Sequence, residues 1–127
     1  MPVINFIKKR IDSVRYALNG IFLIISTQHN AWIHFLMTVF VVVLSLFLKV
    51  SAVEWTMLVL AIVSVWVAEA LNTAIEHLGD SVSPDEYHPL IGKSKDVAAG
   101  AVLIAAIGAA IIGIIVFLPK ILAFYGR

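Results

Sequence analysis

Acidic residues are concentrated in one short part of this sequence. Six of the eight fall within 28 residues: Glu69, Glu76, Asp80, Asp85, Glu86 and Asp96. Glu69, Asn72 and Glu76 are spaced at i, i+3 and i+7, so a helix with about 3.6 residues per turn places them on one face. Asp80 follows one turn later if the helix continues. The spacing therefore predicts a groove lined by two carboxylates and a carboxamide.

Glu69 is the one charged residue in a predominantly apolar segment, residues 55–75. A charged side chain inside a membrane helix costs about 2.5 to 3.5 kcal/mol on insertion scales, so it normally faces protein or water and serves a function. The structural alternative is a protonated carboxyl group that bridges two helices. Glu76 could be merely solvated near the membrane interface, and Asn72 could simply hold two helices together.

Carboxylate and carboxamide oxygens suit Mg²⁺, which proteins typically hold with one or two carboxylates together with substrate phosphates. This pairing indicates nucleotide chemistry. Lys93 and Lys95 could neutralise phosphate charge, as phosphoryl transfer requires, or could anchor the chain to anionic lipid headgroups. The sequence has no glycine-rich loop followed by lysine and no kinase catalytic-loop motif, which excludes the soluble nucleotide-binding folds.

The four histidines are weaker signals. His88 lies in the acidic segment and could contact a nucleotide. The other three lie near predicted membrane interfaces, where a histidine is more often hydrogen-bonded or solvated than catalytic: His29, His34 and His77.

The composition places these residues in a membrane protein. Of the 127 residues 61% are hydrophobic and 13% are charged, and the mean hydropathy is +1.02, whereas soluble domains carry about 25% charged residues. There is no cysteine, which excludes disulfides and thiolate metal sites. The net charge of +1 argues against a nucleic-acid partner.

Three apolar segments are long enough to cross about 30 Å of hydrocarbon as helices. They predict an all-α membrane protein in one domain, with spans at about 31–48, 55–75 and 97–118. The short connection 49–54 predicts that the first two spans form an antiparallel hairpin. Glycines and prolines between positions 77 and 96 predict an irregular loop there.

Residues 3–27 have a different pattern, because apolar side chains recur every three or four positions and charged or polar side chains occupy the rest. This periodicity predicts an amphipathic helix at the membrane surface that is retained in the mature protein. Counting lysine and arginine gives six on the side of the N-terminus and of the loop 77–96, against three on the other. The difference predicts a cytoplasmic N-terminus.

Small residues recur every fourth position in the third span, at Ala101, Ala105, Ala109 and Gly113. Such a stripe permits close approach of another helix. Three spans and one surface helix can hardly enclose a nucleotide and a lipid headgroup alone, so we expect the chain to form oligomers.

Three spaced motifs together resemble those of the small integral-membrane lipid kinases of prokaryotes, which comprise diacylglycerol kinase and undecaprenol kinase. The motifs are E-A-L-N-T-A-I-E at 69–76, E-Y-H-P-L at 86–90 and K-D-V-A-A-G-A-V-L at 95–103. The resemblance covers nearly the whole chain. The loop pattern around Pro84 and Pro89 and the C-terminal segment 115–122 look closer to the undecaprenol kinase branch.

The resemblance implies a homotrimer in the bacterial inner membrane that transfers the γ-phosphoryl of ATP, with Mg²⁺, to a lipid hydroxyl at the cytoplasmic face. The product is phosphatidic acid or undecaprenyl phosphate. The resemblance implies that Glu69 is the general base, Asn72 an active-site amide and Glu76 a metal ligand. The positions that match the nucleotide site or its surroundings are Glu86, His88, Lys95 and Asp96.

The chain departs from the family pattern at two positions. Gln28 stands where the family usually has a second metal-binding glutamate, and Trp32 stands where many members have arginine. An amide still offers an oxygen to Mg²⁺ but lacks the negative charge. Gln28 therefore raises an alternative function, a catalytically impaired member that binds lipid or nucleotide. A membrane scaffold without a ligand is a third interpretation, which the coincident motifs disfavour.

Overall fold

The computed structural model describes residues 2–84 and 88–126, and within these ranges every regular element is a helix. The four helices are α1 (Pro2–Thr27), α2 (His29–Phe47), α3 (Ala52–Val82) and α4 (Pro89–Tyr125). This confirms the all-α fold class. Helices α2, α3 and α4 are long and apolar enough to cross a membrane, which confirms the three candidate spans.

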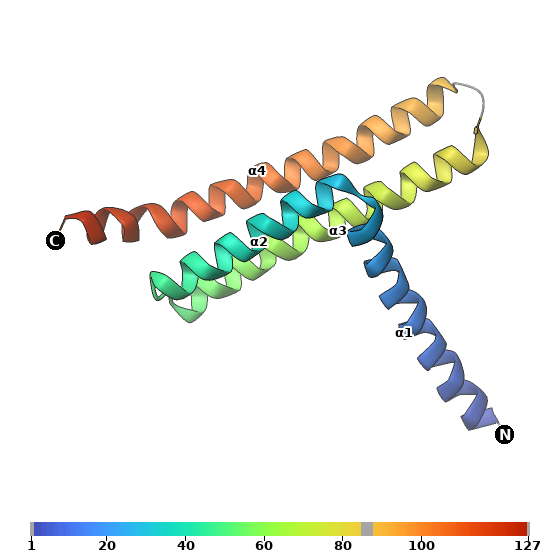
Figure 1. Cartoon of the computed structure of the whole chain (residues 1–127), viewed down its shortest axis with the longest axis horizontal. Helices are drawn as coiled ribbons and strands as arrows, with labels where there is room; N and C mark the ends of the chain where they lie inside the picture. Colours follow the sequence, from blue (N-terminus) through green and yellow to red (C-terminus); the bar gives the residue numbers. More distant parts are fainter. Residues whose placement is uncertain (1, 85–87, 127) are drawn as a thin grey trace.

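Helix α4 lies alongside α3, and α2 runs antiparallel to α3 on a neighbouring face (Figure 1). Helix α1 projects away from the other three at a steep angle (Figure 1). Most of its described side chains are exposed along the whole length. Helix α1 covers the segment predicted to be helical at 3–27, whereas its amphipathic character and its position at a membrane surface stay predictions.

A tight turn joins α2 to α3 and makes the predicted hairpin antiparallel. Lys49 has a φ of 51°, the left-handed region that lets the chain reverse within a few residues. Ser51 then caps α3, because its hydroxyl accepts a hydrogen bond from the Glu54 N–H at 3.3 Å. The Glu54 carboxylate in return accepts one from the Ser51 N–H at 2.6 Å. This reciprocal capping box satisfies two backbone donors at the helix start.

The hairpin end also contains the apolar core of the chain. The cluster consists of Val50, Leu58, Val116 and Phe117, each less than a tenth exposed. Beside it, Lys120 Nζ lies 3.0 Å from Glu54 Oε2. This ion pair links α4 to the first turn of α3.

The structure corrects the predicted irregular loop at 77–96. Helix α3 continues to Val82 and α4 begins at Pro89, so most of that segment is helical and Asp80 does lie on the same helix as Glu76. Proline at the first helical position is favourable, since its missing N–H would be unpaired there in any case. Gly79 allows close packing, because a Cβ there would lie 2.8 Å from Ile91 Cγ2.

Helix α4 likewise passes the predicted end of its span at 118. Pro119 lies inside the helix, which ends only at Tyr125. Prolines are tolerated within membrane helices because neighbouring helices, side chains and local adjustments of the helix satisfy the backbone groups that proline leaves unpaired. The small-residue stripe borders an apolar cavity of about 290 Å³ among α2, α3 and α4, which Ala109 and Gly113 line.

Candidate active site

A second cavity, of about 310 Å³, lies among α2, α3 and α4 and contains the predicted groove. Helix α3 contributes Glu69, Asn72 and Glu76 to it, so the spacing of these residues along one face does bring them together. The α4 wall is apolar: Ala99, Val102, Leu103 and Ala106. The polar side chains of α3 therefore face an α4 wall whose side chains offer them no hydrogen bond.

The Glu69 side chain is deeply buried in this cavity. The residue is 1% exposed, and neither carboxylate oxygen has a hydrogen-bond partner among the described residues. The Asn72 side-chain oxygen is also buried and unpartnered there. An unsatisfied buried polar group costs about 1 to 3 kcal/mol, and more when charged, so three such atoms in one cavity indicate a binding or catalytic site.

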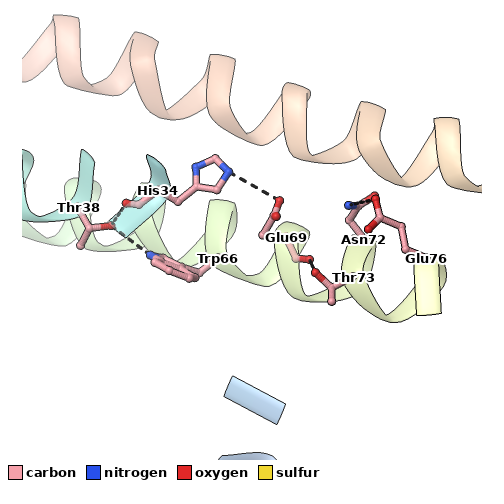
Figure 2. A network of polar contacts seen from close by, with 7 residues as sticks. All are labelled: His34, Thr38, Trp66, Glu69, Asn72, Thr73 and Glu76. Carbon is pink, nitrogen blue, oxygen red and sulfur yellow. Dashed lines mark hydrogen bonds and ion pairs between the residues drawn. The ribbon is translucent and has the colours of Figure 1, made fainter. Parts of the chain in front are cut away.

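Asn72 and Glu76 are held together by a direct contact. Asn72 Nδ2 donates a hydrogen bond to Glu76 Oε1 at 3.0 Å (Figure 2). This contact fixes the orientation of the amide and leaves its oxygen available to a ligand. The hydroxyl of the next residue, Thr73, donates to the Glu69 backbone oxygen at 2.9 Å, which keeps that hydroxyl out of the cavity.

Helix α2 adds a residue that the sequence interpretation undervalued. His34 Nε2 lies 3.7 Å from Glu69 Oε2 (Figure 2), and the histidine side chain is 17% exposed. Asn30, one turn earlier on α2, also lines the cavity. The signal was available, because Asn30, His34 and Thr38 recur every fourth position in an apolar span.

Two further side chains hold His34 in place. The Thr38 hydroxyl donates to the His34 backbone oxygen at 2.8 Å and accepts a hydrogen bond from Trp66 Nε1 at 3.1 Å. The Trp66 ring meets the His34 ring edge-on, with 6.4 Å between their centroids. Figure 2 shows this network reaching Glu69 from the side of α2.

The predicted nucleotide residues do not join this cavity. His88 and Lys95 line a smaller one, of about 160 Å³, where α3 ends and α4 begins. Lys95 Nζ donates a hydrogen bond to Asp80 Oδ1 there. Asp96 is exposed and lines neither cavity, and the prediction for Glu86 falls outside the described residues.

Gln28 lies at the junction of α1 and α2, half-buried. It occupies the N-cap position of α2 without a side-chain capping hydrogen bond and does not line the Glu69 cavity of the single chain. Its assignment as a metal ligand stays a prediction.

The helices and the cavity define a multi-pass membrane protein with a buried polar site in its helix bundle. The family model for prokaryotic diacylglycerol kinase matches residues 15–117, and the chain belongs to this family. This confirms the family resemblance found in the sequence.

Curated relatives agree with this assignment. Undecaprenol kinase of Bacillus subtilis (strain 168) is 36% identical over 117 residues, which cover 92% of this chain and 94% of the relative. Diacylglycerol kinase of Synechocystis is 40% identical over 111 residues, 87% of this chain and 63% of the relative. Diacylglycerol kinase of Escherichia coli (strain K12) is 41% identical over 70 residues, which cover 55% of this chain and 57% of the relative. Together these matches indicate a bacterial membrane lipid kinase.

Proposed function

We propose that this protein transfers the γ-phosphoryl group of ATP to the hydroxyl of a membrane lipid, either diacylglycerol or undecaprenol. The product is phosphatidic acid or undecaprenyl phosphate. The observation that carries this proposal is the Glu69 carboxylate, 1% exposed and without a hydrogen-bond partner among the described residues. Both oxygens of such a group are available to accept the proton of an incoming hydroxyl.

Glu69 is the general base of the proposed reaction. Its carboxylate takes the proton of the lipid hydroxyl as the hydroxyl oxygen forms a bond to the γ-phosphorus and ADP leaves. Asn72 presents its unpartnered oxygen to the same space, held by Glu76 at 3.0 Å. The amide therefore orients a ligand beside the base.

The donor set fits Mg²⁺. Glu76 and Asn72 supply hard oxygen atoms in one cavity, and Gln28 is proposed as a further ligand. The described residues contain no group of three or more His, Cys, Asp or Glu that could hold a metal ion. Mg²⁺ commonly keeps waters and binds through one or two carboxylates plus substrate phosphates, and it would neutralise charge on those phosphates.

The nucleotide is proposed to extend towards the α3–α4 connection. His88 and Lys95 line the cavity there, while Glu86 and Asp96 are assigned to the nucleotide by resemblance alone. Lys95 already pairs with Asp80, so nucleotide phosphates must compete with that carboxylate or share the ammonium group. This end is proposed to be cytoplasmic, and the lysine and arginine count supports that orientation.

A homotrimer is proposed because one chain leaves the site incomplete. The Glu69 cavity has about 310 Å³, the low end of the range for small-molecule pockets, and must admit a lipid hydroxyl together with nucleotide phosphates. Helix α1 projects away from its own bundle (Figure 1), so it could cover the bundle of a neighbouring chain. Cross-linking in mild detergent should give a discrete trimer, and an active monomer at high dilution would contradict it.

The decisive experiment is a radiolabelled ATP assay in mixed micelles, with diacylglycerol and undecaprenol offered separately. Undecaprenol is the favoured acceptor, because the undecaprenol kinase relative is matched over 94% of its length. Label in one lipid, lost in Glu69→Gln, supports the proposal. Label in neither lipid from correctly assembled protein favours instead the impaired member that binds lipid or nucleotide.

A further inference from the structure

We propose that His34 receives the proton from Glu69 after each phosphoryl transfer and so restores the base for the next turnover. This inference rests on the proposed function and assigns a role to a side chain on a different helix from the base. His34 acts through Glu69, so it is a positioning residue that also accepts a proton.

The need for such a residue follows from the burial of Glu69. At 1% exposure, a carboxyl group that has taken up the lipid proton has almost no direct contact with water. The neighbouring His34 side chain is 17% exposed and lies 3.7 Å away, measured from its Nε2 to Glu69 Oε2. His34 is therefore the polar side chain through which a proton can leave the buried carboxyl group.

The 3.7 Å separation is longer than a hydrogen bond, which spans about 2.7 to 3.2 Å. Hydrogen bonds that carry proton transfer are often long without substrate and shorten in the reacting complex. A change of roughly half an ångström brings the two atoms into contact. Side-chain rotation at the Glu69 cavity suffices, because the carboxylate has no hydrogen bond among the described residues that it would have to break.

His34 is also oriented for this role. The Thr38 hydroxyl donates a hydrogen bond to the His34 backbone oxygen and accepts one from Trp66 Nε1. The Trp66 ring in turn packs edge-on against the imidazole. The three residues form a closed arrangement that keeps Nε2 directed at Glu69 (Figure 2). Nε2 accepts a proton when the ring hydrogen is on Nδ1.

The proton balance is complete without a further reactant. The lipid O–H bond breaks and its proton goes to Glu69 Oε2, while the oxygen replaces ADP at the γ-phosphorus. The proton then moves from Glu69 Oε2 to His34 Nε2, giving imidazolium and carboxylate, and finally from the imidazolium to water. Each turnover releases one proton and leaves both side chains as they began.

Few other titratable groups face His34. Helix α3 contributes Glu69 and Glu76 to the two cavities that His34 borders, and α4 contributes only apolar residues and glycine to them. Helix α1 contributes no lining residue, and the remaining polar residues that α2 contributes are Asn30 and Thr38. Within the described part of the chain, the proton therefore has Glu76 as its other nearby acceptor, and that residue already accepts from Asn72.

The apolar cavity beside His34 makes a direct test available. With about 290 Å³, it has space near position 34 for an added imidazole once the side chain is removed. In His34→Ala we expect kcat for lipid phosphorylation to fall about 10- to 100-fold, below the full contribution of a general base, with an unchanged KM for lipid. Added imidazole should restore part of kcat, and substituted imidazoles of higher basicity should restore more.

Three controls isolate this role. His29→Gln changes an exposed histidine at the start of the same helix and should leave kcat unchanged. Glu69→Gln should gain nothing from imidazole, because no proton reaches position 34. If His34→Ala does not assemble, His34→Gln keeps a polar side chain of similar length and should show the same loss of kcat with an altered solvent deuterium isotope effect.

The inference is overturned if folded His34→Gln has a kcat within twofold of the unchanged protein, or if imidazole does not raise the activity of folded His34→Ala. A loss confined to KM also overturns it, since that indicates a binding role. A wild-type protein that phosphorylates no lipid overturns the proposed function itself, whereas active wild type with an active His34→Gln removes only the role of His34.

Discussion

Two of the three glutamates on helix α3, Glu54 and Glu69, lie in opposite environments. Glu54, in its first turn, accepts a hydrogen bond from the Ser51 N–H at 2.6 Å and lies 3.0 Å from Lys120 Nζ. Glu69, further along the same helix, is more deeply buried and has no hydrogen-bond partner among the described residues. One carboxylate is matched by its own chain, and the other is left for a ligand.

The two ends of the bundle differ in the same way. At the hairpin end, Leu58 and Phe117 pack in an apolar cluster, and the buried Ser45 hydroxyl donates to a backbone oxygen at 2.7 Å. At the other end, polar atoms are buried without partners around Glu69. The apolar cluster at the hairpin end therefore stabilises the bundle, whereas the unpartnered polar atoms around Glu69 destabilise it. Such a local loss of stability is typical of a functional site.

Exchanging each glutamate for glutamine gives the largest contrast. Glu69→Gln removes the proposed base and should lower lipid phosphorylation about 10²- to 10⁴-fold, with oligomer state unchanged. Glu54→Gln is the matched control on the same helix and should retain transfer while its thermal midpoint falls slightly. Activity of a folded Glu69→Gln within a few-fold of wild type, in the same assay, would remove Glu69 from this role.

Glu76→Gln tests the charge of the site while keeping its geometry. The Asn72 hydrogen bond at 3.0 Å can still be accepted by the glutamine oxygen, so the variant loses chiefly a negative charge. We expect transfer to fall about 10²-fold or more, and raised Mg²⁺ should not restore it. The measurement is a Mg²⁺ titration of phosphorylation, and full recovery at high Mg²⁺ would show that the site needs only one carboxylate.

Part of this contrast could be predicted from the sequence. The i, i+3, i+7 spacing places Glu69, Asn72 and Glu76 in one cavity because it depends only on local helical geometry. The contribution of His34 could not be predicted in the same way, since its contact with Glu69 depends on how α2 packs against α3. Spacing along one helix says nothing about the rotation of its neighbour.

The helix ends show a second limit. Gly79 and Pro89 look like helix-breaking residues when taken singly, yet one lies within α3 and the other starts α4. In a membrane protein the cost of unpaired backbone groups favours continuing a helix. The candidate spans were therefore predictable, whereas the lengths of α3 and α4 beyond them depended on packing at the connection.

Leu58→Ala acts on the hairpin end alone. Leu58 is 2% exposed in the apolar cluster, so the change leaves a cavity and should cost about 2 kcal/mol, the low end for such substitutions. Helices in a bilayer associate with little hydrophobic driving force, because lipid tails are as apolar as a leucine side chain. Part of the usual free-energy cost of a Leu-to-Ala substitution is therefore absent. We expect a lower midpoint of denaturation in detergent but normal kcat at low temperature. A large loss of kcat in the folded variant would mean that the two ends are coupled.

Gly79→Ala tests the role of the α3–α4 connection in nucleotide binding. An added Cβ would lie 2.8 Å from Ile91 Cγ2 and 2.9 Å from Lys95 Cε, so Lys95 must move from its place beside Asp80. We expect the KM for ATP to rise about three- to tenfold with little change in kcat, as for lost ground-state binding. Lys93→Gln, on an exposed neighbour, is the control. An unchanged KM for ATP in Gly79→Ala would argue against a nucleotide role for Lys95.

The smallest expected effect concerns Gln28, where the chain has an amide in place of the usual family glutamate. A carboxylate at this half-buried position adds one negative charge near the polar end of the bundle, and its attraction for a cation is stronger where water is partly excluded. Nucleotide phosphates arrive with Mg²⁺ already bound, so they supply much of the affinity. Gln28→Glu should therefore lower the Mg²⁺ concentration for half-maximal phosphorylation by a factor of about 2 to 5.

The matched control for this change is Gln28→Asn, which shortens the side chain without adding charge. It should not lower the Mg²⁺ midpoint, because the expected gain comes from charge and not from the presence of a polar group. In the single chain Gln28 does not line the Glu69 cavity, so an effect on Mg²⁺ requires that the side chain approach the metal site in the assembled protein. An unchanged midpoint in Gln28→Glu places position 28 outside the metal shell and leaves Glu76 as the protein ligand proposed for Mg²⁺.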